Sequence, residues 1–251
     1  MNAPQSSELP LILLGAGGHA KVLLALAKSA GLVVQGLCDP TLAQQGLSDW
    51  MGLPVLGGDE ALDGIDPREV GLINGLGQLA GQRFRSRLFE NMKARGFTFP
   101  VLVHPTAWVA PTARLEQGVQ IMAGAIVQPD CSIGENTIIN TRASVDHDCR
   151  IGKDVHIAPG ATLCGGITIE DDAFIGSGAT LIQGLHIGAR AVAGAGVTLV
   201  RDLPSDARAL GPSRKPSWLP PRITRTEPCH KKTRAGPRPS CPWAQASRTQ
   251  S

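Results

Sequence analysis

The sequence has no tyrosine, and its aromatic residues are five phenylalanines and four tryptophans in 251 residues. A core built from stacked aromatic rings is therefore excluded. No apolar stretch approaches the roughly 20 residues that a membrane-spanning helix needs, so we expect no membrane span. The six cysteines form no CxxC pair, and the first residues, MNAPQSSELP, lack the pattern of a secretory signal. We therefore expect reduced thiols and a cytoplasmic protein.

Basic residues are scarce in most of the chain and concentrated at its end. Residues 213–251 hold nine Lys or Arg and one acidic residue, whereas residues 1–212 hold 15 basic and 20 acidic side chains. The net charge of +3 thus comes from the tail, and we predict no nucleic-acid partner. Because the tail is rich in Pro, Arg, Ser and Thr, it is typical of a disordered extension.

The strongest pattern that is present is an aliphatic residue at every sixth position. Fifteen of sixteen successive positions hold Val, Ile or Leu. These sixteen positions are Val109, Leu115, Ile121, Val127, Ile133, Ile139, Val145, Ile151, Ile157, Leu163, Ile169, Ile175, Leu181, Ile187, Ala193 and Leu199. A period of six fits neither an α-helix nor a single strand, and it indicates a left-handed parallel β-helix with three short strands in each coil of eighteen residues.

Small residues accompany this repeat and define its corners. Small or β-branched residues, such as Ala125, Ala143 and Cys149, stand four residues after many of the aliphatic positions. Glycines such as Gly134 and Gly176 follow the aliphatic position directly, where a side chain would crowd the turn. The register does not slip between residues 109 and 199, so we expect about five coils without a long inserted loop.

A different pattern precedes the repeat. Residues 11–37 read as strand, glycine turn, helix and strand, which is the opening of a Rossmann-like α/β domain. A second strand, turn and helix follow, ending at Gly96. The predicted organisation is an extension at residues 1–9, a Rossmann-like nucleotide-sugar-binding domain at 10–100, the β-helix at 101–212 and the tail at 213–251.

The glycine turn of this domain predicts a binding site for a diphosphate. Gly15, Gly17 and Gly18 let the backbone approach a phosphate, and the helix that follows supplies free N–H groups. We include His19 in this turn, Asp39 at the end of the next strand, and Asn74 in the second glycine-rich turn. A nicotinamide dinucleotide would use the same turn, although the domain is short for two mononucleotide halves.

Three segments together resemble a known family. GAGGHAKV near the start, INTRASVDHDCRIG and KDVHIAPGATLCGGITI look like the sugar acyltransferases that include sialic acid O-acetyltransferase and the bacillosamine-pathway N-acetyltransferase. The resemblance covers residues 10 to 212. It implies acetyl-CoA as acyl donor, a nucleotide-linked amino sugar from surface glycan synthesis as acceptor, and a homotrimer with its active sites between adjacent subunits.

The resemblance also implies roles for four residues. His147 matches the catalytic base, and Asp148 matches the acidic residue that orients its imidazole. His156 matches a histidine at the acetyl-CoA site, and Gly165 matches a glycine beside the thioester. The repeat agrees in part, because Gly165 follows His147 by eighteen residues and should stack on the same edge.

Several alternatives remain open at this stage. The motifs do not separate an amine acceptor from a hydroxyl acceptor, so O-acetylation of a sialic-acid-type sugar is the rival activity. Cys149 could form an acyl-enzyme, but its position in the repeat is one of small core residues. His147, His156 and His186 do not differ by multiples of eighteen, so we predict no metal site. A non-catalytic nucleotide-sugar-binding scaffold and a nicotinamide-dependent reductase are the alternatives from other classes.

Overall fold

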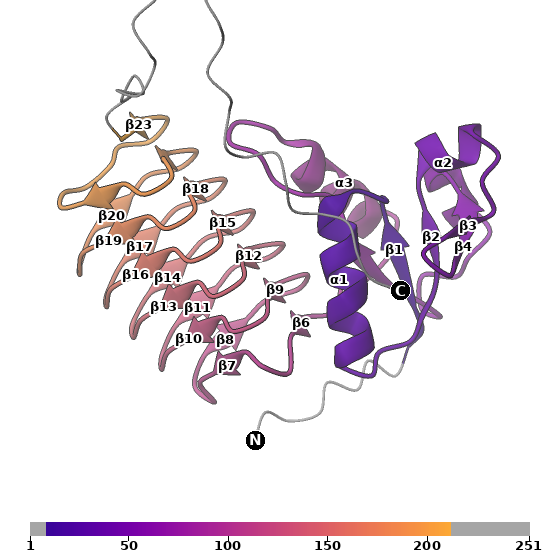
Figure 1. The fold of residues 1–251 in the computed structure, drawn as a ribbon, viewed down its shortest axis with the longest axis horizontal. Helices are drawn as coiled ribbons and strands as arrows, with labels where there is room; N and C mark the ends of the chain where they lie inside the picture. Colours follow the sequence, from indigo (N-terminus) through magenta and orange to yellow (C-terminus); the bar gives the residue numbers. More distant parts are fainter. Residues whose placement is uncertain (1–8, 212–251) are drawn as a thin grey trace, which may run out of the picture. The chain divides into compact units, whose positions relative to one another are not determined.

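A computed structural model describes residues 9–211, in which an α/β domain is followed by a β-helix (Figure 1). This confirms the predicted fold class. The extension expected at residues 1–9 lies almost wholly outside the described residues, and the tail at 213–251 lies wholly outside them. No helix within residues 9–211 is long and apolar enough to cross a membrane.

The α/β domain is a five-stranded sheet with helices, in the strand order β3-β4-β2-β1-β5. Its elements are β1 (Leu11–Leu14), α1 (Gly18–Ser29), β2 (Val34–Cys38), α2 (Pro40–Gln44), β3 (Asp49–Trp50), β4 (Leu53–Gly57), the 3-10 helix η1 (Asp59–Leu62), β5 (Gly71–Asn74) and α3 (Phe84–Ala94). All neighbouring strands are parallel except β3 and β4. The loops after β1, β2 and β5 therefore meet at one edge of the sheet, where ligands bind in such folds.

The β-helix has three faces, each a parallel sheet of two-residue strands. Face I consists of β7 (Trp108–Val109), β10 (Ile126–Val127), β13 (Ser144–Val145), β16 (Thr162–Leu163), β19 (Thr180–Leu181) and β22 (Thr198–Leu199). Face II consists of β8 (Arg114–Leu115), β11 (Ser132–Ile133), β14 (Arg150–Ile151), β17 (Thr168–Ile169) and β20 (His186–Ile187). Face III consists of β6 (Leu102–Val103), β9 (Gln120–Ile121), β12 (Ile138–Ile139), β15 (His156–Ile157), β18 (Phe174–Ile175), β21 (Val192–Ala193) and β23 (Arg208–Ala209).

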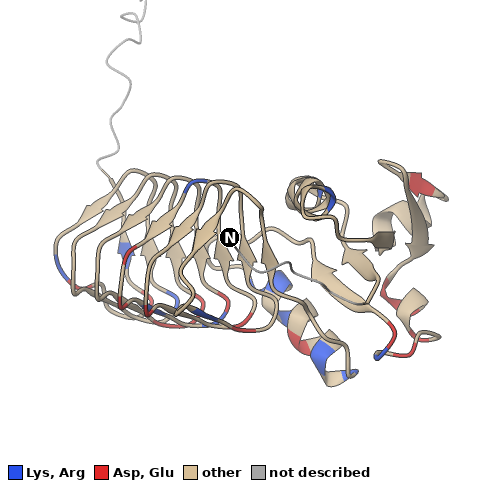
Figure 2. Ribbon diagram, turned by 90° about the horizontal axis from the view of Figure 1, so that it is seen from below, with Lys and Arg blue, Asp and Glu red and all other residues tan. Residues whose placement is uncertain are grey.

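The second residue of each strand points into the prism, as the six-residue repeat predicts. These aliphatic side chains form one core together with the small residues four positions later, among them Ala125, Cys131, Ala143 and Cys149. Most charged residues of the β-helix lie in the turns between the strands (Figure 2). The interior is thus filled by apolar side chains, and most charged side chains lie at the corners.

One corner residue in every six adopts the left-handed conformation that L-residues rarely adopt. From Gly118 to Gly196 this position has a φ between 56° and 73°, and it is occupied by Gly, Asp, Asn or Arg. Asp and Asn tolerate this conformation better than most side chains do. Asp148 is one of them, with a φ of 60°.

The α/β domain packs against the lower coils of face III. Leu102, Met122 and Ile138 of that face share one apolar cluster with leucines of β1 and α1. Beside this cluster, the buried guanidinium of Arg85 donates hydrogen bonds to the carbonyl oxygens of Asn74 (2.8 Å) and Leu76 (2.8 Å) on one side. On the other side, the Arg85 guanidinium donates a hydrogen bond to the carbonyl oxygen of Asn136, a corner residue of the β-helix (3.3 Å). This network fixes the loop after β5 onto the β-helix.

The last coil is shorter than the others. All strands up to β22 pair with a partner eighteen residues away, but Val192 of β21 pairs with Arg208 of β23, sixteen residues later. Arg190 and Asp206, which face each other at the corner of this coil, form a bidentate ion pair at 2.7 Å. The regular repeat therefore stops within the last coil.

The corner glycines provide a test of the stacking. An added Cβ at Gly176 would lie 2.5 Å from the backbone N of Ala195 in the next coil, whereas an added Cβ at Gly178 meets nothing within 4 Å. We expect Gly176→Ala to lower the free energy of unfolding by about 2 kcal/mol or more. Gly178→Asn, at a left-handed position that Asn136 already occupies in another coil, should stay within about 0.5 kcal/mol of wild type. The measurement is thermal unfolding followed by circular dichroism. Equal losses of unfolding temperature in the two variants would contradict the stacking at Gly176.

Candidate functional site

His147 lies at the corner between faces I and II, in the turn from β13 to β14. Its backbone N–H donates to Asp146 Oδ1 at 2.8 Å, and its Nδ1 lies 2.7 Å from Asp148 Oδ2. Because a carboxylate only accepts, the ring proton sits on Nδ1 and Nε2 carries the lone pair. The side chain is 62% exposed, and Nε2 forms no hydrogen bond with any of residues 9–211, so its lone pair is available to a substrate proton.

The two aspartates also tune the basicity of this histidine. The hydrogen bond that His147 donates to Asp148, followed by the charge of Asp146, raises the pKa of His147. The left-handed backbone at Asp148 turns its carboxylate back toward the preceding residue. A tight corner of the β-helix therefore builds the His–Asp pair from adjacent residues.

Gly165 lies directly against the imidazole ring, one coil further along the β-helix. An added Cβ at Gly165 would lie 2.6 Å from both Cε1 and Nε2 of His147, so any larger residue would displace the imidazole ring. The neighbouring Gly166 N–H donates to the carbonyl oxygen of His147 at 2.8 Å. Among residues 9–211 the Gly165 N–H itself has no acceptor. The predicted stacking thus places an available backbone donor beside the imidazole of His147.

His156 occupies a different place. It lies on face III, opposite the corner of His147, and it is only 8% exposed. Its Nδ1 is 3.2 Å from the carbonyl oxygen of Gln78, and its Nε2 is 3.0 Å from Nδ2 of Asn140. Burial lowers the pKa of His156 to about 4, so the ring is neutral and both nitrogens are occupied. One chain does not bring His156 together with His147 and Gly165.

Cys149 points into the interior of the β-helix. Its side chain is buried, and its Sγ donates to the carbonyl oxygen of Cys164 at 3.3 Å. The hydrogen bond with the buried thiol of Cys131, together with burial, raises the pKa of Cys149. A protonated thiol inside the prism has no access to an acyl donor, which disfavours the acyl-enzyme alternative.

His186 pairs with an acidic side chain on face II, its Nε2 being 3.0 Å from Glu170 Oε1. Within the described part of the chain, no group of three or more His, Cys, Asp or Glu side chains is arranged to hold a metal ion.

The glycine turn of the α/β domain opens onto a pocket of about 570 Å³. Gly15 has a φ of 87° and packs against Leu76, whereas Gly17 and Gly18 are exposed with open space around them. Helix α1 begins at Gly18 and has no side-chain cap, so its first N–H groups are free for an anion. The pocket is lined by Gly15, Cys38, Asp39, Pro40, Thr41, Asp59, Leu76, Gly77, Phe84, Arg87, Leu88 and Asn91.

Asp39 lines this pocket and also holds its wall in place. One carboxylate oxygen accepts the N–H of Ala16 in the glycine turn at 2.9 Å. The other accepts the N–H groups of Thr41 and Leu42, which caps α2. Asp39 therefore joins the glycine turn to the loop after β2.

His19 and Asn74 face the β-helix instead of the pocket. His19 Nε2 lies 2.8 Å from Gln120 Oε1 on β9, and burial lowers the pKa of His19 to about 4. The side chain of Asn74 is buried and donates to Asn136 Oδ1 at 3.2 Å and to the carbonyl oxygen of Arg85 at 3.0 Å. Both residues thus belong to the contact between the two domains.

Sequence reasoning missed Asp59, Arg87 and Asn91 in the pocket. Arg87 and Asn91 are four residues apart on α3, and this spacing signals that they share one helix face. Asp59 follows a strand that the sequence analysis did not predict, and we know of no signal that could have identified it.

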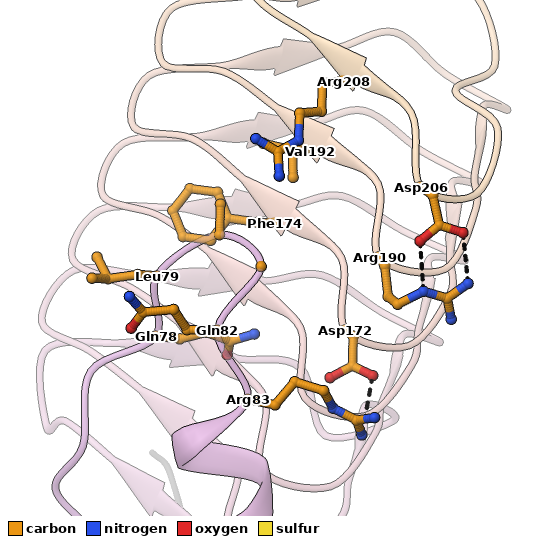
Figure 3. Close-up of a pocket in the computed structure, with 12 residues that line it drawn as sticks. Gln78, Leu79, Gln82, Arg83, Asp172, Phe174, Arg190, Val192, Asp206 and Arg208 are labelled. Carbon is orange, nitrogen blue, oxygen red and sulfur yellow. Dashed lines mark hydrogen bonds and ion pairs between the residues drawn. The ribbon is translucent and has the colours of Figure 1, made fainter.

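A second hollow, of about 240 Å³, lies between the loop at 78–83 and the upper coils of face III (Figure 3). Arg83 pairs with Asp172 at 3.5 Å on one side of it. Phe174, which contacts His156 edge to face at 5.1 Å, forms part of its floor. The side chain of Gln78 donates to the carbonyl oxygen of Asp154, while its buried Oε1 has no hydrogen-bond partner among residues 9–211. The loop after β5 thus shapes both hollows.

Known families match most of the described residues. Residues 10–92 match the family described as the PglD N-terminal domain. Residues 112–147 and 132–165 match the bacterial transferase hexapeptide family, and residues 166–201 match the hexapeptide repeat of succinyl-transferase. No match was found among curated proteins.

Solved structures resemble the whole described chain. PerB from Caulobacter crescentus, in complex with CoA and GDP-perosamine, is 37% identical, has a TM-score of 0.73, and matches over 80% of this chain and 94% of its own. The acetyltransferase domain of PglB from Neisseria gonorrhoeae, in complex with acetyl coenzyme A, is 36% identical, with a TM-score of 0.75 and coverage of 80% and 96%. WeeI from Acinetobacter baumannii, at 23% identity and a TM-score of 0.72 over 81% and 97%, shares the fold.

The His–Asp pair predicts a measurable change in basicity. We expect Asp148→Asn to lower the pKa of His147 toward that of an ordinary histidine, because the charged acceptor at Nδ1 is lost. Asparagine already occupies the equivalent left-handed corner at Asn136, so the backbone should tolerate it. The measurement is an NMR titration of the histidine ring protons, with the His147 signal assigned from His147→Gln. Asp130→Asn, one coil below, is the control and should leave the pKa of His147 unchanged. An equal His147 pKa in wild type, Asp148→Asn and Asp130→Asn would contradict the pairing.

Proposed function

This chain belongs to the hexapeptide-repeat sugar acyltransferases with a PglD-type N-terminal domain, and we propose that it transfers the acetyl group of acetyl-CoA to the amine of a nucleotide-linked amino sugar. The observation that carries this proposal is the corner where His147, held by Asp148, lies against Gly165. A base with a free Nε2 and a backbone donor beside it is what acyl transfer to a neutral nucleophile requires.

The proposed reaction is a direct transfer. The sugar amine attacks the thioester carbonyl while Nε2 of His147 takes up its proton. The C–N bond forms first, and the carbonyl oxygen becomes an oxyanion. The tetrahedral adduct then collapses as the C–S bond breaks, and CoA leaves as its thiolate, which takes the proton from the His147 imidazolium. The Gly165 N–H is the proposed donor to the oxyanion, and Asp148 stabilises the imidazolium through Nδ1.

The acceptor nucleotide is assigned to the pocket of the α/β domain. Gly15, Gly17 and Gly18 leave room for the diphosphate at the start of α1. Support comes from PerB, whose structure contains CoA and GDP-perosamine, and from a related structure that is named perosamine N-acetyltransferase. Both substrates are metabolites of the cytoplasm, where we place the reaction.

We further propose a homotrimer whose active sites lie between adjacent subunits. The α/β domain packs on face III through His19 and Gln120, whereas His147 lies at the opposite corner of the prism. The body of the β-helix separates the two parts within one chain. A sugar held in the pocket of one subunit would therefore react at His147 of the next. The predicted role of His156 at the acetyl-CoA site also needs a neighbouring subunit, because one chain keeps His156 on face III apart from His147 and Gly165.

The transfer is tested by the release of CoA, followed with a thiol reagent. Purified protein with acetyl-CoA and a panel of UDP- and GDP-linked 4-amino sugars should release CoA, and His147→Ala should reduce the rate by about 10²- to 10⁴-fold. His186→Ala, an exposed histidine paired with Glu170, is the matched control and should retain the wild-type rate. Release with sialic acid alone would favour O-acetylation, and binding without any release would favour a non-catalytic scaffold.

The site between subunits is tested by mixing two inactive variants. Gly17→Asp should fit the open space at this N-cap but repel a diphosphate, whereas Gly17→Ala should remain active. When His147→Ala and Gly17→Asp are unfolded and refolded together, we expect about a quarter of the wild-type activity to return, because random trimers then contain sites with both intact halves. A site contained within one chain predicts no recovery above that of each variant alone.

A further inference from the structure

The nucleotide pocket has two chemically different ends. Gly15 and Gly77 line the end beside the glycine turn, where the neighbouring Leu76 accepts a hydrogen bond from Arg85 in the first turn of α3. Asp59 lines the other end, close to where α3 finishes, because the guanidinium of Arg95 at its C-cap donates to the carbonyl oxygen of Asp59 at 3.3 Å. The pocket therefore runs along α3, and a diphosphate at the glycine end would direct the base toward Asp59.

The carboxylate of Asp59 has no hydrogen-bond donor within residues 9–211. The nearby Arg95 directs its Nη2 to Asp63 at 2.7 Å instead, and Glu60 accepts the N–H of Gly58. Asp39, by contrast, accepts three backbone N–H groups. Partial burial, followed by the charge of Glu60, raises the pKa of Asp59, as expected for a carboxylate that lacks a compensating donor.

Arg87 supplies the opposite charge on the same wall of the pocket. It projects from the middle of α3, is exposed, and forms no ion pair with any described acidic residue. A cation on the wall of a pocket that Gly15 also lines suits a diphosphate, which leaves Asp59 for a group that donates hydrogen bonds.

We propose that Asp59 recognises the base of the acceptor nucleotide and that this base is guanine. The Watson–Crick edge of guanine presents two adjacent donors, N1–H and the N2 amino group, and these match the two oxygens of a carboxylate. Uracil offers one N–H between two carbonyl oxygens, which would repel Asp59. Adenine and cytosine offer one amino group beside an acceptor nitrogen. The assignment rests on the proposed function, since it names the nucleotide that this pocket selects.

The test is calorimetric titration of the full chain with GDP, IDP and UDP. Inosine lacks only the N2 amino group, so wild type should bind IDP about 10- to 100-fold more weakly than GDP. UDP should bind more weakly than GDP as well. In Asp59→Asn the preference for GDP over IDP should shrink to about twofold. Asp63→Asn, which removes a neighbouring carboxylate outside the pocket lining, is the control and should keep the wild-type preference.

Three results would overturn the assignment: equal binding of GDP and IDP by wild type, tighter binding of UDP, or no binding of any of the three nucleotides. A full GDP preference in Asp59→Asn would also overturn it. The wild-type series alone shows whether the pocket prefers guanine, even if Asp59→Asn fails to fold. Because the titration needs no acetyl-CoA, it is separate from the transfer assay. GDP selectivity without CoA release would contradict the proposed function alone, and CoA release with a UDP-linked sugar but no GDP preference would contradict this assignment alone.

Discussion

The vertical stacking of residues eighteen apart is the constraint on which the corner formed by His147, Asp148 and Gly165 depends. Each coil hydrogen-bonds to the next, so Gly166 is held on His147 by a 2.8 Å backbone bond, and Gly165 is brought against the imidazole. No long loop has to be ordered to build this arrangement. The geometry is fixed by the same backbone bonds that hold the β-helix together, which keeps the cost of organising the site low.

The separation of the α/β-domain pocket from the corner of His147 follows from the same architecture. A three-sided prism has a corner opposite each face, and the α/β domain covers the face opposite His147. The buried contacts of Arg85, Asn74 and Gln120 make this placement specific, because each of these polar groups would lose its partners if the domain moved. Within a single chain, the pocket of the α/β domain and His147 therefore belong to opposite sides of the β-helix.

Much of this architecture is readable from the sequence, and the reason is periodicity. A strict period of six determines which residues point inward, and eighteen residues per coil places Gly165 over His147 without any coordinates. The strand, glycine turn and helix at residues 11–29 carry an equally local signal. No local sequence signal reveals the surroundings of His19, Asn74 and His156, because their partners are about 60 to 100 residues away. Glycine and histidine in a turn look the same in sequence whether they face a ligand or a neighbouring domain. Asp59 was missed for a related reason, since only the folded sheet brings it to the end of the pocket.

The shortened last coil has a consequence for assembly. A parallel β-helix ends in unpaired strand edges, and a regular end could serve as a template for a second copy stacked end to end. The two residues are missing from the turn after β22, because Thr180 still pairs with Thr198 but Ile187 already pairs with Leu203, sixteen residues later. The next corner is stacked again, since the Asp206 N–H donates to the carbonyl oxygen of Ala189 at 2.9 Å and Arg190 pairs with Asp206. A further coil of eighteen residues would meet a turn that is two residues shorter than its own, so this coil is a poor template for end-to-end stacking.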